Sequence, residues 1–98
     1  MTRETVDGSG NLFRDLGLPN PELRQLKALL AAQIIRVLDD RDLTARQAQV
    51  ETGIAAADFS RIRHVNLARF TVDRLMTILD RLGQDVDVSV TVQPRRAA

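Results

Sequence analysis

One stretch of alternating valines constrains the fold of this sequence more than any other feature. In "DVDVSVTVQP", residues 85–94, valines alternate with polar residues until Pro94 ends the pattern, which is typical of a half-buried β-strand. A lone strand leaves backbone N–H and C=O groups unpaired along its edges. We find no second convincing strand in the sequence, so this strand requires a partner.

The simplest partner is the same strand of a second copy, paired antiparallel about a twofold axis. The side chains expected at this dimer contact are Val86, Val88, Val90 and Val92. Two alternatives stay open: pairing with residues 12–18 of the same chain, or a frayed strand. The expected plan is a flexible tail over 1–10, a helical domain over 11–84, a dimerisation strand over 85–93 and a tail over 94–98.

Before this strand the apolar residues recur at helical spacing. Asn20-Pro21-Glu22 is a helix-start signal, and the apolar stripe that follows extends to about Asp40. Thr44 and Gln47 form a capping-box pattern for a second helix, which Gly53 ends in the left-handed conformation. The sequence therefore predicts a mostly α-helical protein, a small helical bundle with one C-terminal strand.

Two further helices complete the expected bundle. The third extends from Ala55 to about Val65 and buries Phe59 and Ile62, with Ile54 in the corner before it. The fourth begins at the capping residue Thr71, carries an apolar stripe and ends at Gly83. The residues of that stripe are Leu75, Ile78, Leu79 and Leu82.

Composition argues against several classes of function. The 98 residues suffice for one small domain, and they include no Cys, one His and no glycine-rich phosphate loop. The single histidine, His64, has no companion ligands, so no metal site is expected. The adjacent carboxylates Asp39 and Asp40 do not share a helix face and are expected to be solvated. We therefore predict no enzyme activity and no cofactor. With no signal peptide and no apolar run long enough to span a bilayer, we expect a cytoplasmic protein without membrane contact.

The charge distribution hints at a basic surface. The net charge is only +1, but thirteen of the fourteen basic residues are Arg, which suits bidentate contacts to phosphate and guanine. From Thr44 to Arg74 five arginines stand against three acidic residues. A GC-rich genome, which favours arginine codons, is the alternative explanation.

A short helix, a glycine turn and a second short helix over residues 44–65 suggest a helix-turn-helix, whose second helix enters the major groove of DNA. Two ordinary packed helices remain the alternative.

The sequence also resembles a known family. "NLFRDLG", "LTARQAQVETGIAAADFSRI" and "RFTVDRLMTILDRLGQDVDVSV" are similar to segments of Xre-type (phage-repressor-like) helix-turn-helix proteins, most of all to the short antitoxin subgroup of type II toxin–antitoxin systems. The resemblance covers residues 11–93. It implies a homodimer that represses transcription at a palindromic operator in double-stranded DNA, and a possible cognate toxin as partner.

This sequence departs from the family pattern where bases are read. Ala45 stands where the family often has Gln, and Ala56 and Ala57 stand where it often has polar residues. Val65 replaces the usual glycine, so His64 or Asn66 is expected to take the left-handed turn. The candidate DNA contacts are Arg46, Ser60, Arg61, Arg63, His64 and Arg69. The resemblance implies a base or phosphate contact for Ser60 and a phosphate contact for Arg69.

Two functions follow. The first is a sequence-specific DNA-binding repressor that autoregulates its operon as an antitoxin and binds a cognate toxin. The second is a toxin-neutralising protein-interaction module with a degenerate helix-turn-helix and little DNA binding.

Overall fold

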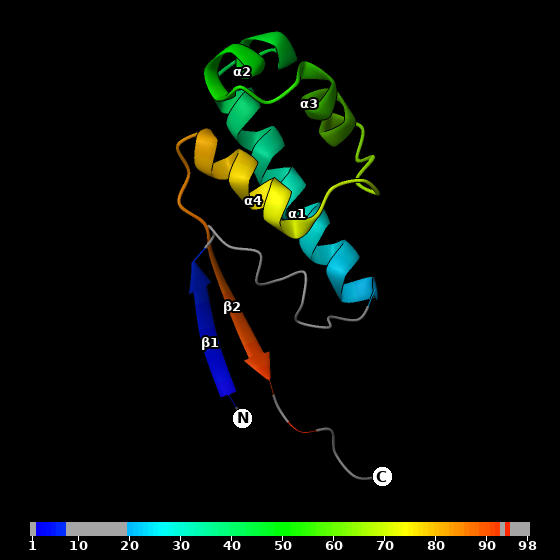
Figure 1. The fold of residues 1–98 in the computed structure, drawn as a ribbon, viewed down its shortest axis with the longest axis vertical. Helices are drawn as coiled ribbons and strands as arrows, with labels where there is room; N and C mark the ends of the chain where they lie inside the picture. The colour runs from blue at the N-terminus through cyan, green and yellow to red at the C-terminus, as the bar shows by residue number, and fades with distance from the viewer. Residues whose placement is uncertain (1, 8–19, 93, 95–98) are drawn as a thin grey trace.

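The computed structural model describes residues 2–7, 20–92 and 94. The predicted contacts of residues 12–18 lie outside these ranges. In chain order the elements are β1 (Thr2–Asp7), α1 (Asn20–Asp40), α2 (Ala45–Thr52), α3 (Ala56–Arg63), α4 (Val72–Arg81) and β2 (Asp87–Val92) (Figure 1). The predicted mostly helical fold is confirmed.

The long helix α1 is the platform on which α3 and α4 pack. It contacts both α4 and α3, while α2 packs on α3. Figure 1 shows α2 and α3 together at one end of the molecule and the two strands at the other. The helix pair that carries the candidate site therefore lies away from the sheet. Among the described residues, no helix combines the length and hydropathy needed to cross a membrane.

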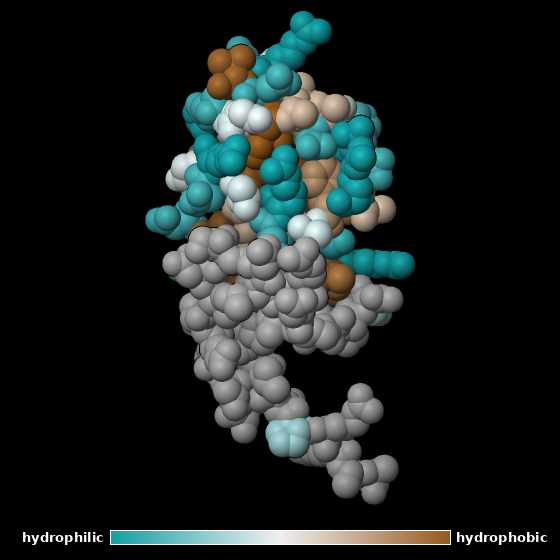
Figure 2. All heavy atoms as spheres, in the orientation of Figure 1, coloured by the Kyte–Doolittle hydropathy of each residue, from teal (hydrophilic) through white to brown (hydrophobic). Residues whose placement is uncertain are grey.

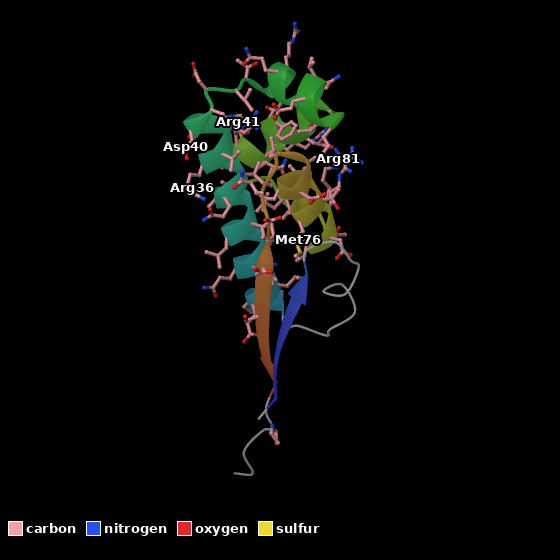
Figure 3. All side chains as sticks on the ribbon, turned by 90° about the vertical axis from the view of Figure 1, so that its left-hand side faces the viewer. Arg36, Asp40, Arg41, Met76 and Arg81 are labelled. Carbon is pink, nitrogen blue, oxygen red and sulfur yellow. The ribbon has the colours of Figure 1, made fainter. Side chains whose placement is uncertain are left out.

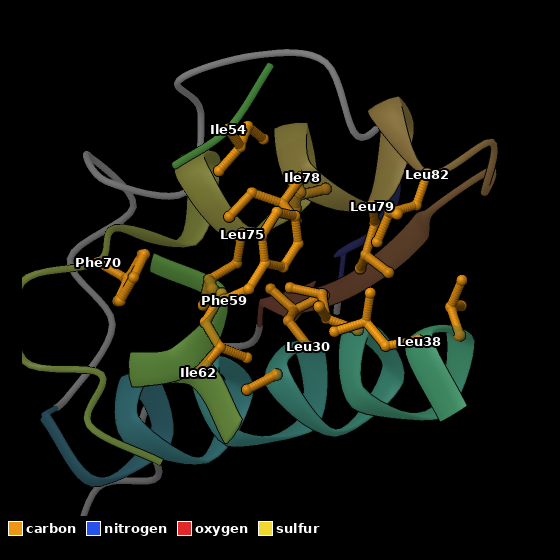
Figure 4. Close-up of a cluster of buried hydrophobic side chains, with 14 of the residues drawn as sticks. Leu30, Leu38, Ile54, Phe59, Ile62, Phe70, Leu75, Ile78, Leu79 and Leu82 are labelled. Carbon is orange, nitrogen blue, oxygen red and sulfur yellow. The ribbon is translucent and has the colours of Figure 1, made fainter. Parts of the chain in front are cut away.

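One core joins all four helices. Figure 4 shows side chains of α3 and α4 converging on α1, with Phe59 among them. Phe59, Ile62, Leu75 and Ile78 are fully buried. Burial of each such side chain stabilises the fold by roughly 1.5–3 kcal/mol relative to exposure. The stripes predicted from helical spacing are confirmed.

The helix ends follow the predicted capping chemistry. The Thr44 hydroxyl accepts a hydrogen bond from the backbone N–H of Gln47 (3.1 Å), and the Gln47 side chain accepts one from the N–H of Thr44 (2.8 Å). Gly53, after α2, has a φ of 76°, a conformation that costs glycine little. Thr71 caps α4 by accepting from the N–H of Arg74.

The two strands correct the sequence analysis. The inference that β2 has no partner in its own chain is wrong, because β2 pairs antiparallel with β1, from Thr2 opposite Val92 to Asp7 opposite Asp87. Residues 2–7 thus form a strand, where a flexible tail was expected. "TRETVD" contains β-branched residues but one strongly apolar residue, Val6, so it lacks the alternation that marks a half-buried strand.

Two of the predicted dimerisation valines have a role within the chain. Val86 and Val88 are half-buried and pack against the helical core. Val90 and Val92 lie opposite Glu4 and Thr2 in the register, and their side chains lie outside what the structure describes. Pairing of β2 with a second copy stays a prediction.

The turn after α3 is a second correction. Val65 itself takes the left-handed conformation, with a φ of 56°, where His64 or Asn66 was expected to do so. The N–H of Val65 donates to the carbonyl of Ile62 and that of Asn66 to the carbonyl of Arg61, so Val65 occupies the position that closes the helix. A β-branched residue is strained there.

Candidate nucleic-acid interface

The turn between α2 and α3 is held by hydrogen bonds from three parts of the chain. The Thr52 hydroxyl donates to the carbonyl of Ala48 (2.6 Å) and accepts from the N–H of Ile54 (3.1 Å). Arg81, at the end of α4, donates to the carbonyl of Thr52 (3.1 Å). Ile54 is buried at the corner, as predicted. These contacts hold the end of α2 and the turn that follows it, and they tie this turn to the end of α4.

The start of α3 is capped by a residue of α2. Ala55 precedes α3 and its side chain makes no capping hydrogen bond. Instead, the Gln49 side-chain oxygen accepts from the backbone N–H of Ala56 (2.8 Å). The sequence analysis missed this role, because the two residues are seven positions apart and belong to different helices.

The leading end of α3 carries little chemistry of its own. Ala57 is exposed and Ala56 half-exposed; alanine can contact a thymine methyl group but cannot form hydrogen bonds to base edges. Ser60 is exposed one turn further on, and Arg46 is exposed in the first turn of α2. Within the described residues Arg46 forms no ion pair. Polar side chains cover most of the visible face of the helical body (Figure 2).

Two of the predicted contacts, Arg61 and Arg63, already have acidic partners. Arg61 donates to Asp58 one turn earlier on α3, at 2.9 Å. Arg63 donates to Asp39 of α1, also at 2.9 Å, and lies 3.5 Å from the carbonyl oxygen of Leu43. Arg63 therefore ties the end of α3 to the end of α1, and this contact separates it from the other candidate arginines.

His64 closes α3. Its Nδ1 lies 2.8 Å from the carbonyl oxygen of Ser60, and since a carbonyl can only accept, Nδ1 carries the proton. This contact lies at the C-terminal end of α3 and engages the side chain that was predicted as a DNA contact.

Arg69 belongs to a cluster. It lies in the loop between α3 and α4 and lines a hollow whose other residues are Asp58, Arg61, Phe70, Thr71 and Arg74. Arg74 extends the predicted site. The start signal at Thr71 places Arg74 in the first turn of α4, but its approach to Asp58, at 3.7 Å, is a tertiary contact that spacing alone does not show.

A further ion pair links α2 to the end of α1. Arg41, after α1, donates to Glu51 of α2, and this hydrogen bond raises the pKa of the Arg41 guanidinium. Arg41 and Arg81 approach the motif from two different helix ends (Figure 3).

The comparisons with known proteins give one result. The model of a helix-turn-helix domain family matches residues 12–91. No curated protein and no solved structure matches the chain.

Proposed function

The chain belongs to this helix-turn-helix domain family, a DNA-binding class, and from that premise we propose that it is a sequence-specific transcriptional repressor. The observation that carries the proposal is the pair α2 and α3, joined through Gly53 at an exposed end of the molecule. In this motif α3 enters the major groove, while α2 crosses the backbone.

In this proposal most of the affinity comes from phosphate contacts. Arg46 and Arg69 are exposed and have no ion pair within the described residues, so both are available to the DNA backbone. Base reading is left mainly to Ser60, because the alanines at the start of α3 offer only methyl contacts and Arg61 is paired with Asp58. Sequence preference then depends partly on the shape of the DNA.

Fluorescence polarisation with a labelled duplex tests this function. The probe is the DNA upstream of the protein's own coding sequence, with a scrambled duplex of equal length as competitor, over a series of salt concentrations. We expect preference for the upstream DNA and a log–log salt slope of roughly −0.9 for each phosphate contact. Arg46→Gln should weaken binding to both duplexes, whereas Arg36→Gln on α1 should change neither.

Homodimerisation belongs to the same proposal. Two α3 helices in successive major grooves would lie about 34 Å apart and read a palindrome. β1 covers one edge of β2, so in this proposal a second copy pairs along the other edge or packs on the sheet. Analytical ultracentrifugation at micromolar concentration tests the dimer. The mass of a single subunit, both with and without DNA, would contradict it.

The antitoxin role is also proposed, and the resemblance of residues 11–93 supports it. Co-expression with the product of the neighbouring reading frame tests it: a small toxic protein that co-purifies and loses its toxicity is the expected result.

One observation favours the interaction-module alternative. Arg61 and Arg63, two of the candidate contacts on α3, are held by Asp58 and Asp39. Toxin binding without measurable affinity for any duplex at low salt would establish that alternative.

A further inference from the structure

The hollow between α3 and α4 gathers three arginines from three separate segments. Arg61 belongs to α3, Arg69 to the loop and Arg74 to the first turn of α4, and all three line the same hollow together with Thr71. Arginine guanidinium groups match the geometry of phosphate oxygens and bind them by paired hydrogen bonds.

One carboxylate already faces these arginines. Asp58 lies 2.9 Å from Arg61 through one oxygen and 3.7 Å from Arg74 through the other. Its side chain is 21% exposed, less than the 35% of Arg61 and the 43% of Arg74. Arg69 forms no ion pair in the described parts of the chain. The hollow therefore keeps an excess of positive charge and an unpaired guanidinium.

The surrounding backbone adds to this field. Thr71 caps α4, and the N-terminus of a helix carries a partial positive charge. The arginines, rather than the helix end, define the site, because they are the groups that can take an oxyanion by direct hydrogen bonds.

We propose that this hollow binds one DNA backbone phosphate, and that Asp58 is an internal anion which the phosphate must displace from Arg61 and Arg74. The inference rests on the proposed DNA binding, extends the phosphate contact proposed for Arg69 to Arg61 and Arg74, and adds the charge of Asp58 as a determinant of affinity. In the free protein Asp58 keeps the two guanidinium groups oriented. In the complex it competes with the phosphate for them and repels it.

A pair of substitutions with opposite expected effects tests this site. Asp58→Asn keeps the size of the side chain and removes its charge, so it should tighten binding to the upstream duplex by roughly threefold or more. Arg74→Gln should weaken binding to all duplexes and lower the salt slope by about one. Arg36→Gln removes the same charge from α1 and should do neither. Loss of the fold cannot explain a gain and a loss from two variants of one hollow.

The outcomes separate this inference from the proposed function. If wild-type protein binds the duplex but Asp58→Asn and Arg74→Gln both behave like it, the hollow is not a phosphate site although DNA binding stands. If wild-type protein binds no duplex, the proposed function fails. A titration with inorganic phosphate, followed by NMR of the arginine side chains, then tests whether the hollow binds an oxyanion in the absence of DNA. Shifts at Arg61 and Arg74 would then assign it to free oxyanions and overturn the DNA assignment; their absence would overturn the site altogether.

Discussion

Gln49 of α2 caps α3 by accepting a hydrogen bond from the backbone N–H of Ala56, at 2.8 Å. The helix that is proposed to enter DNA therefore has no cap of its own and depends on the helix before it. This contact couples the two halves of the motif by a single side chain.

Replacing Gln49 should show this dependence. Gln49→Ala leaves the N–H of Ala56 without its side-chain acceptor and should lower the free energy of unfolding by about 1 kcal/mol, the usual cost of a lost cap. Gln25→Ala, at an exposed position of α1, is the control and should stay within about 0.5 kcal/mol of wild type. Urea denaturation measures both. Equal stabilities for the two variants would mean that the cap contributes nothing.

Val65 offers a stabilising substitution. Its φ of 56° is strained for a β-branched residue and free for glycine. Val65→Gly should raise the free energy of unfolding by up to about 1 kcal/mol, because relief of roughly 1–2 kcal/mol of strain exceeds the entropy that glycine adds to the unfolded chain.

The matched control uses the same substitution on a regular helix. Val50 is 88% exposed within α2, where glycine is the poorer helix former. Val50→Gly should therefore destabilise the protein by roughly 0.5 kcal/mol. Thermal unfolding distinguishes the two signs. A destabilised Val65→Gly protein would show that the valine side chain stabilises the turn by more than its strain costs.

The ion pair of Arg63 with Asp39 lends itself to a double-mutant cycle. Arg63→Ala, Asp39→Ala and the double variant should give a coupling energy of about 0.5 kcal/mol, since the pair lies at the surface. The coupling should fall at 1 M salt. A coupling energy of zero at low salt would mean that the ion pair does not stabilise the fold, and Arg63 would remain a candidate DNA contact.

Arg81 should stabilise the motif from outside it. Arg81→Ala removes the donor to the carbonyl of Thr52 and should cost about 1 kcal/mol, while Arg81→Lys, which keeps a donor on a flexible stem, should recover part of that loss. Hydrogen exchange in α2 and α3 should increase in the alanine variant. If exchange increases only within α4, Arg81 acts on its own helix.

The sheet is expected to be separable from the helical body. Deleting residues 1–7 removes the partner of β2, so the amide protons of β2 should lose their protection from hydrogen exchange. Those of α1 and α4 should keep theirs to within about tenfold, because the main core is formed by the helices. Protection of β2 that survives the deletion, and rises with protein concentration, would instead support pairing with a second copy.

Local signals were sufficient for most of the helical body. Caps at Thr44 and Thr71, the left-handed Gly53 and the buried stripes all depend on residues within one or two turns of each other, and all were predicted from spacing. Ile54 was predicted as a corner residue for the same reason.

Contacts between distant segments were not predicted. β1 carries too few apolar residues to mark itself as a strand, and pairing with β2 creates it. Three long side chains have partners that depend on how the helices pack. Gln49 caps α3, Arg63 contacts Asp39, and Arg74 approaches Asp58. Val65 was misjudged because local preference argued against it, while the hydrogen bonds of the turn outweighed that preference.

The pairing of β1 with β2 has a consequence for the order of folding. One strand precedes all four helices and the other follows them, so the ladder cannot close until the ribosome has released the last of these segments. The helices need only nearer contacts and can assemble earlier. A nascent chain can therefore reach a stage in which α3 is already packed against the other helices while the sheet is still open.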